Sequence, residues 1–145
     1  MEINNCEILE QKMEQRKPVE EAYVSLEIAK ALKDYGFCEN CRAGYNIKTD
    51  EFKLFDYTID NLDTDDDWVA APTQQMAMRW LREVQDLYIS VGYCSDFNKL
   101  MKAGYYVMVT DMDGDNQRNG GVASLKTYEE SVDAGIKCAL NLIKF

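Results

Sequence analysis

A change of hydrophobic period in the middle of the chain constrains the fold most. Apolar residues recur at helical spacing from 74 to 84, and the preceding Pro72 and Thr73 are typical of a helix start. From 87 to 93, Leu, Ile, Val and Tyr occupy alternate positions, which is the period of a β-strand. A helix that leads almost directly into a strand predicts a fold that mixes the two. The expected buried stripe of the helix is Met76, Ala77, Trp80, Leu81 and Val84.

Two further helices carry start and stop signals. Ser25 precedes an amphipathic segment at 26–35, and Gly36 follows it as the expected left-handed cap. Near the C-terminus, Thr127 and Glu130 have the spacing of a capping box in front of a last helix. Its apolar stripe is expected at Val132, Ile136, Leu140 and Ile143.

The remaining strand signals fall into two groups. Aromatic and β-branched runs at 45–47 and 52–59 flank a polar turn and predict a hairpin. Runs at 105–110 and 121–125, separated by Asp-Gly and Asn-Gly turns, predict antiparallel partners for the strand at 87–93.

These elements together predict an α+β fold with the order α-ββ-α-βββ-α. We expect an antiparallel sheet of about five strands packed against about three helices. Residues 1–20 are polar with sparse apolar positions, and they are expected to form an N-terminal extension or helical arm. Residues 21–145 are then a single α+β domain, because no Pro/Gly/Ser-rich linker divides them.

Charge restricts the classes of partner. The chain has 26 acidic and 16 basic residues, for a formal net charge of -10. Binding to nucleic acid depends on Lys and Arg that neutralise phosphates, so direct DNA or RNA binding is not expected. Anionic lipids would also repel the chain, and no apolar run approaches the roughly 20 residues of a membrane span. The N-terminus lacks a signal-peptide pattern, so a cytoplasmic protein is expected.

Histidine is absent from the chain, which removes the commonest general base and metal ligand. Triads that depend on imidazole are therefore excluded. Five cysteines in a reducing compartment predict free thiols. Cys38 and Cys41 have the spacing of half a zinc site or a redox dithiol, but no second pair or histidine completes a zinc site, so a loop with two incidental thiols is expected.

Acidic loops are the main candidates for a binding site. Asp63, Asp65, Asp66 and Asp67 lie in a run without basic residues, and self-repulsion predicts an exposed loop. Arg79 and Arg82 are expected on the outer face of the neighbouring helix.

A second acidic run has the opening spacing of a calcium loop. Asp111, Asp113 and Asp115 alternate as in an EF-hand, but Asn116 replaces the expected Gly and Val122 replaces the bidentate Glu. We therefore expect a polar hairpin loop here, with a divalent-metal site as the alternative.

Aromatic residues could form a second kind of binding surface. Five of them are considered as members of a recognition surface, although most are expected to pack the sheet against the helices: Trp68, Tyr88, Tyr93, Tyr105 and Tyr106. An acidic and aromatic patch beside the aspartates would suit a basic protein surface.

Three segments together resemble a known family. They are Val24-Ser25-Leu26-Glu27-Ile28-Ala29-Lys30 with Gly36-Phe37, the run Ala71-Pro72-Thr73-Gln74 through Val84, and Thr127-Tyr128-Glu129-Glu130 with Ala139-Leu140-Asn141-Leu142-Ile143. Over residues 21–145 the chain resembles small uncharacterised proteins encoded by phages, prophages and mobile elements of Bacteroides-type gut bacteria. The resemblance implies a genomic context and no particular chemistry, because the family has no agreed catalytic or binding residues.

These observations lead to an expected function without a cofactor. The leading hypothesis is a non-enzymatic phage or mobile-element protein that binds a host or phage protein through its acidic loops. One version is mimicry of a nucleic-acid backbone on a basic target, which would inhibit a host system. The alternatives are a metal-dependent enzyme or calcium-binding module that uses Asp111, Asp113 and Asp115, and a structural or virion component. The sequence leaves the oligomeric state open.

Overall fold

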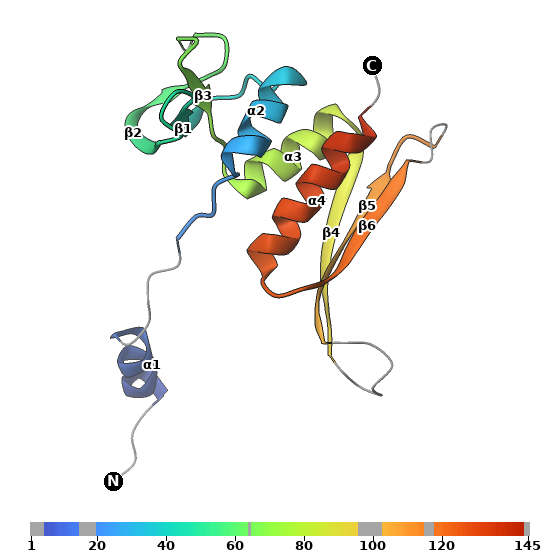
Figure 1. The fold of residues 1–145 in the computed structure, drawn as a ribbon. Coiled ribbons are helices and arrows are strands. Elements are labelled where there is room, and N and C mark those ends of the chain that lie inside the picture. The colour runs from blue at the N-terminus through green and yellow to red at the C-terminus, as the bar shows by residue number, and fades with distance from the viewer. Residues whose placement is uncertain (1–4, 15–19, 64, 96–102, 115–117, 144–145) are drawn as a thin grey trace.

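The computed structural model describes residues 5–14, 20–63, 65–95, 103–114 and 118–143. These residues form four helices and six strands (Figure 1). In chain order they are α1 (Asn5–Glu14), α2 (Leu26–Asp34), β1 (Cys41–Asn46), β2 (Phe52–Ile59), β3 (Trp68–Ala70), α3 (Gln74–Val84), β4 (Leu87–Cys94), β5 (Gly104–Asp111), β6 (Asn119–Leu125) and α4 (Tyr128–Leu142).

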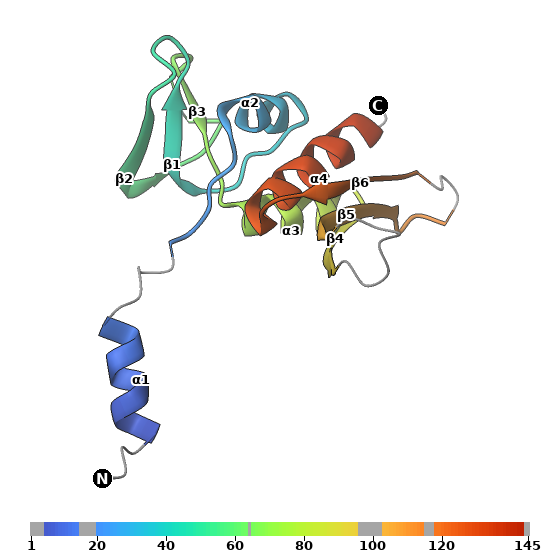
Figure 2. The same ribbon diagram turned by 60° about the horizontal axis from the view of Figure 1, so that its bottom comes forward.

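The α+β class is confirmed, and the expected single sheet of about five strands with three helices is wrong. The described strands form two three-stranded antiparallel sheets, in the orders β2-β1-β3 and β4-β5-β6. The additional strand is β3, whose three residues are too few to show a period in the sequence. The fourth helix is α1, which lies within the segment expected as an extension, and both views show it apart from the other elements (Figures 1 and 2).

Helix starts follow the expected capping chemistry. The hydroxyls of Ser25 and Thr73 accept hydrogen bonds from the backbone N–H groups of Ile28 and Met76, at 3.3 and 3.1 Å. Thr127 caps α4 in the same way. Gly36 follows α2 with a φ of 94°, a conformation in which glycine carries no Cβ penalty.

The core lies where the helices meet both sheets. In both views α2, α3 and α4 lie between the sheet β2-β1-β3 and the sheet β4-β5-β6 (Figures 1 and 2). Leu81 of α3 and Ile136 of α4 are fully buried, and each such side chain stabilises the fold by roughly 1.5–3 kcal/mol. The buried cluster also draws on α2, β1, β3, β4 and β5 through Ile28, Leu32, Ala43, Val69, Leu87, Ile89, Val107 and Val109.

The expected stripe of α3 needs one correction. Ala77, Trp80 and Leu81 are buried as expected, whereas Val84 is 57% exposed, because it belongs to the last turn of the helix and lines a surface groove. Gln74 was not expected in the core, yet it is 6% exposed. Its side-chain amide donates to the backbone oxygen of Glu129 at 3.0 Å, which joins the first turns of α3 and α4.

Each sheet leaves one face without a helix. Helix α4 contacts β4, β5 and β6, and the opposite face of that sheet carries exposed Tyr88, Tyr106 and Met108. Within the smaller sheet, edge strand β2 is largely exposed on both faces, although its aromatic and β-branched composition is typical of a strand with a buried face. None of the described helices has the length and apolarity that crossing a bilayer requires.

Candidate functional site

The acidic run after β2 forms an ordered turn in its described residues. The Asp60 carboxylate accepts hydrogen bonds from the backbone N–H groups of Leu62 and Asp63, at 2.8 and 2.9 Å. Asn61 anchors the turn, because its amide nitrogen donates to the Phe37 oxygen at 2.8 Å and its amide oxygen accepts from Ala70 N–H at 3.0 Å. Short-range Asx geometry of this kind fixes the position of a loop without a hydrophobic contact of its own.

The four aspartates that were singled out as a group point to different places. Asp67 forms an exposed ion pair with Lys48 at 3.2 Å. Asp63 and Asp65 instead line a groove beside the outer face of the small sheet. Asp66 is exposed and is not among the residues that line this groove. The structure therefore brings two of the four carboxylates together at one surface feature.

This feature, which we call the aromatic groove, has a volume of about 350 Å³. Its aromatic rings lie in a row, with ring centroids 5.2 Å apart for Phe55 and Tyr57 and 5.4 Å apart for Phe55 and Trp68. Tyr57 is 63% exposed, so the row is open to solvent at one end. The described residues that line it are Lys53, Phe55, Tyr57, Ile59, Asp63, Asp65 and Trp68.

The strand pairing beside the groove is irregular. Cys41 pairs with Ile59 and Ala43 pairs with Leu54, so β2 contains extra residues between these two points. Such a bulge re-aims side chains at a sheet edge. A Cβ on Gly44 would lie 2.9 Å from Ile59 Cδ1 and 3.0 Å from the Val69 backbone oxygen, so glycine at this position allows close packing over β1.

A cation already lies against one ring of the aromatic groove. The ammonium of Lys53 is 5.6 Å from the centroid of Phe55, which is the distance of a cation–π contact. Within the part of the chain that the structure describes, neither Asp63 nor Asp65 forms an ion pair. The groove thus combines aromatic faces with carboxylates that have no basic partner among the described residues.

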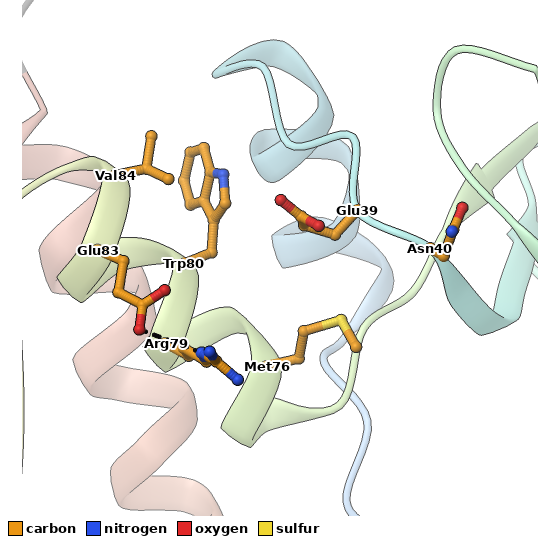
Figure 3. Close-up of a pocket in the computed structure, with 7 residues that line it drawn as sticks. All are labelled: Glu39, Asn40, Met76, Arg79, Trp80, Glu83 and Val84. Carbon is orange, nitrogen blue, oxygen red and sulfur yellow. Dashed lines mark hydrogen bonds and ion pairs between the residues drawn. The ribbon is translucent and has the colours of Figure 1, made fainter.

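Arg79 and Arg82 lie on α3 and do not line the aromatic groove. Arg79 Nε is 3.2 Å from Glu83 Oε1, an exposed pair one turn apart on the helix. Arg79 and Glu83 line a second depression of about 360 Å³, which we call the α3 groove (Figure 3). Its remaining lining residues are Glu39, Asn40, Met76, Trp80 and Val84.

The run expected as a calcium loop contains a buried ion pair. Arg118 Nε is 2.8 Å from Asp111 Oδ2, and the exposed fractions of the two side chains are 10% and 0%. Asp111 also accepts the backbone N–H groups of Asp113 and Arg118, at 2.9 and 3.1 Å. Hydrogen bonding to Arg118 is the main cause that lowers the pKa of Asp111 to about 2.

These contacts give Asp111 a structural role. Arg118 also donates to the backbone oxygens of Leu142, at 3.1 Å, and Gln85, at 3.3 Å, so it links the β5–β6 hairpin to the last turn of α4 and to the residue that caps α3. Asp115, the third expected metal ligand, lies outside the described residues. Among the described residues, no group of three or more Cys, Asp or Glu side chains is arranged to hold a metal ion.

The two cysteines of the Cys-x-x-Cys motif have different environments. Cys38 is exposed, whereas Cys41 is 3% exposed at the start of β1 and its thiol donates to the Glu39 oxygen at 3.5 Å. Burial is the main cause that raises the pKa of Cys41 to about 12, and Glu39 and Asp60 add to the effect. Cys41 is therefore less accessible than Cys38, and its thiol is harder to ionise than an ordinary cysteine.

This difference predicts selective alkylation. Near pH 8, a thiol with a pKa of about 12 is ionised to about one part in ten thousand, and the thiolate is the reactive form. Iodoacetamide is expected to modify Cys38 at least a hundredfold faster than Cys41, as measured by mass spectrometry of tryptic peptides over time. Equal rates at the two positions would contradict the burial of Cys41.

Sequence reasoning found the carboxylates of the aromatic groove and missed most of its rings. Trp68 was among the aromatics considered for a recognition surface, but Phe55 and Tyr57 were assigned only to a strand. Tyr88, Tyr93 and Tyr106 are exposed elsewhere, and Tyr105 is half-buried. The available signal was the adjacency of Trp68 to the aspartate run and a glycine at 44 inside a strand pattern.

Comparisons with protein families, with curated proteins and with solved structures gave no match to this chain.

Proposed function

We propose that this protein is a non-enzymatic interaction protein that binds a basic segment of a partner protein in the aromatic groove. An arginine or lysine side chain of the partner would stack on the rings of Phe55, Tyr57 and Trp68. Its charge would be paired with Asp63 and Asp65 at the rim. The observation that carries the proposal is the row of three rings lined by two carboxylates.

The contact between Lys53 and Phe55 supports a cationic ligand. The negative face of an aromatic ring attracts a cation, and here a lysine of the chain itself lies 5.6 Å from the ring centroid. A guanidinium from a partner stacks on rings more readily than an ammonium does, because it is planar and more weakly hydrated. Arginine is therefore the preferred side chain.

The overall charge supports the same class of partner. A formal net charge of -10 attracts a basic surface over distances longer than a direct contact, and complementary charge accelerates encounter. If the basic surface of the partner normally binds nucleic acid, binding of this protein to that surface would inhibit the partner. The resemblance to phage and mobile-element proteins supports a partner in the cytoplasm of a bacterial host.

Removing the two carboxylates at the rim is the first test. The probe is a capped, fluorescein-labelled peptide of alternating arginine and serine, and its affinity is measured by fluorescence anisotropy. Because an exposed charge pair contributes about 0.2–1 kcal/mol, the Asp63→Asn/Asp65→Asn variant is expected to bind up to about tenfold more weakly. Added salt should weaken the wild-type protein more than this variant.

A matched control comes from the same loop. Asp66→Asn removes one negative charge, as Asp63→Asn or Asp65→Asn alone does, but at a position that does not line the groove, so it is expected to change the affinity less than twofold. An equal loss from Asp66→Asn and from either substitution at the rim would indicate a general effect of net charge. That result would contradict a defined site.

A further inference from the structure

The α3 groove contains a buried donor without a partner. Trp80 is 6% exposed, and its ring packs edge-on against Phe37 with centroids 5.6 Å apart. Its indole N–H makes no hydrogen bond within the part of the chain that the structure describes. Buried tryptophan N–H groups usually have a hydrogen-bond partner, so this donor indicates a position for an acceptor.

The nitrogen edge of Trp80 is directed into the groove. Figure 3 shows the indole nitrogen on the side of the ring that faces Glu39, whose carboxylate points into the same space. Glu39 has no ion-pair partner among the described residues, whereas Glu83 is paired with Arg79. A buried donor and an unpaired carboxylate therefore face one cavity of about 360 Å³.

The shape of the groove favours a chain over a compact molecule. A neighbouring depression of about 350 Å³ shares Asn40 and Met76 with the α3 groove. It is also lined by Tyr23 and Thr73, so the two depressions lie next to each other on the surface. Met76 and the exposed Val84 give the α3 groove apolar contact area between its polar groups.

We propose that the α3 groove binds an extended peptide segment through one backbone carbonyl and one basic side chain. The carbonyl oxygen accepts the Trp80 indole N–H, and the basic side chain pairs with Glu39. This site is separate from the aromatic groove, because the described residues that line the two have no member in common. Either site can exist without the other.

The indole resonance of Trp80 reports directly on this site. In ¹⁵N-labelled protein the chain's two tryptophans give two indole signals, and Trp68→Phe identifies the one that belongs to Trp80. The probes are a capped tripeptide of alanine, arginine and alanine, a capped tripeptide of alanine alone, and guanidinium ion at the same millimolar concentration. A hydrogen bond to the carbonyl is expected to move the Trp80 signal downfield in a saturable manner.

The three probes separate the two contacts. The arginine peptide is expected to bind about two- to fivefold more tightly than the alanine peptide, which corresponds to one exposed ion pair, and guanidinium alone should not move the Trp80 signal. Glu39→Gln should make the affinities of the two peptides equal. If neither peptide gave a saturable shift, or if guanidinium gave the same shift, the carbonyl contact would be disproved. Equal affinity of the two peptides for the wild-type protein would disprove the role of Glu39.

The Asp63→Asn/Asp65→Asn variant is the control that separates this site from the aromatic groove. It should leave the Trp80 titration unchanged while weakening the fluorescein-labelled peptide. Loss of the Trp80 shift in this variant would mean that the tripeptide acts from the aromatic groove, and it would overturn the inference.

Discussion

An Arg118→Ala variant is expected to unfold at a midpoint about 5–10 °C below that of the wild-type protein. The substitution leaves the buried Asp111 carboxylate without its cation and removes the donors to the Leu142 and Gln85 oxygens. Asp111 would keep its hydrogen bonds from the backbone N–H groups of Asp113 and residue 118, but it would lose the charge-assisted hydrogen bond that is its strongest contact. Circular dichroism at the helical band, followed during heating, measures the midpoint.

Arg79→Ala is the control for the loss of an arginine. Its pair with Glu83 is exposed on both sides and joins residues one turn apart, so the expected change in midpoint is small. Similar midpoints for the two variants would show that Arg118 does not hold the hairpin against α3 and α4.

The same pair predicts how stability depends on pH. The pKa of Asp111 is about 2 in the folded protein, against an ordinary value of 3.8. Between these two values the unfolded chain binds more protons than the folded one, so the contribution of this pair is complete above about pH 4 and falls as the pH is lowered toward 2. In denaturant titrations at several pH values, Arg118→Ala should show a shallower loss of stability over this window.

Trp68→Ala is expected to weaken binding of the arginine–serine peptide by about tenfold or more. A cation over a tryptophan face contributes from about 0.5 kcal/mol at an exposed site to about 2 kcal/mol when desolvated, and the alanine variant also loses ring area. Trp68→Phe keeps a ring at this position and should retain most of the affinity. Fluorescence anisotropy measures both variants, after circular dichroism has shown that each is folded.

The pattern of the two variants distinguishes stacking from charge alone. If Trp68→Ala bound the peptide as tightly as the wild-type protein, the Trp68 ring would contribute nothing to the affinity. The carboxylates would then account for the binding without stacking. That result would contradict the aromatic groove as a site.

The sequence was sufficient for elements with local signals. Helices α2, α3 and α4 and strands β4, β5 and β6 were predicted near their observed bounds, because caps and hydrophobic period are properties of neighbouring residues. The division into two sheets was not predicted. Which strands pair depends on contacts far apart in the chain, such as the pairing of Gly44 with Ala70, and no period within a segment encodes them.

The candidate site was predicted only in part, because its carboxylates have a local sequence signal and its long-range contacts do not. The exposed aspartate loop follows from composition alone, but which of its carboxylates line the groove depends on a turn held by Asp60 and by the contacts of Asn61 with Phe37 and Ala70, residues that lie far apart in the chain. Asp111 illustrates the opposite case. The spacing of the aspartates made a divalent-metal site the alternative to a polar hairpin loop. The ion pair of Asp111 with Arg118 is visible only in three dimensions.

Mapping the contact of a basic peptide on the protein tests the proposed function most directly. Backbone amide signals of ¹⁵N-labelled protein are followed while the unlabelled arginine–serine peptide is added. Saturable shifts are expected at 52–59 and 65–68, around the aromatic groove, together with the side-chain signal of Trp68. Shifts centred on Tyr88, Tyr106 and Met108 of the open sheet face, or no saturable shift at all, would contradict the proposal.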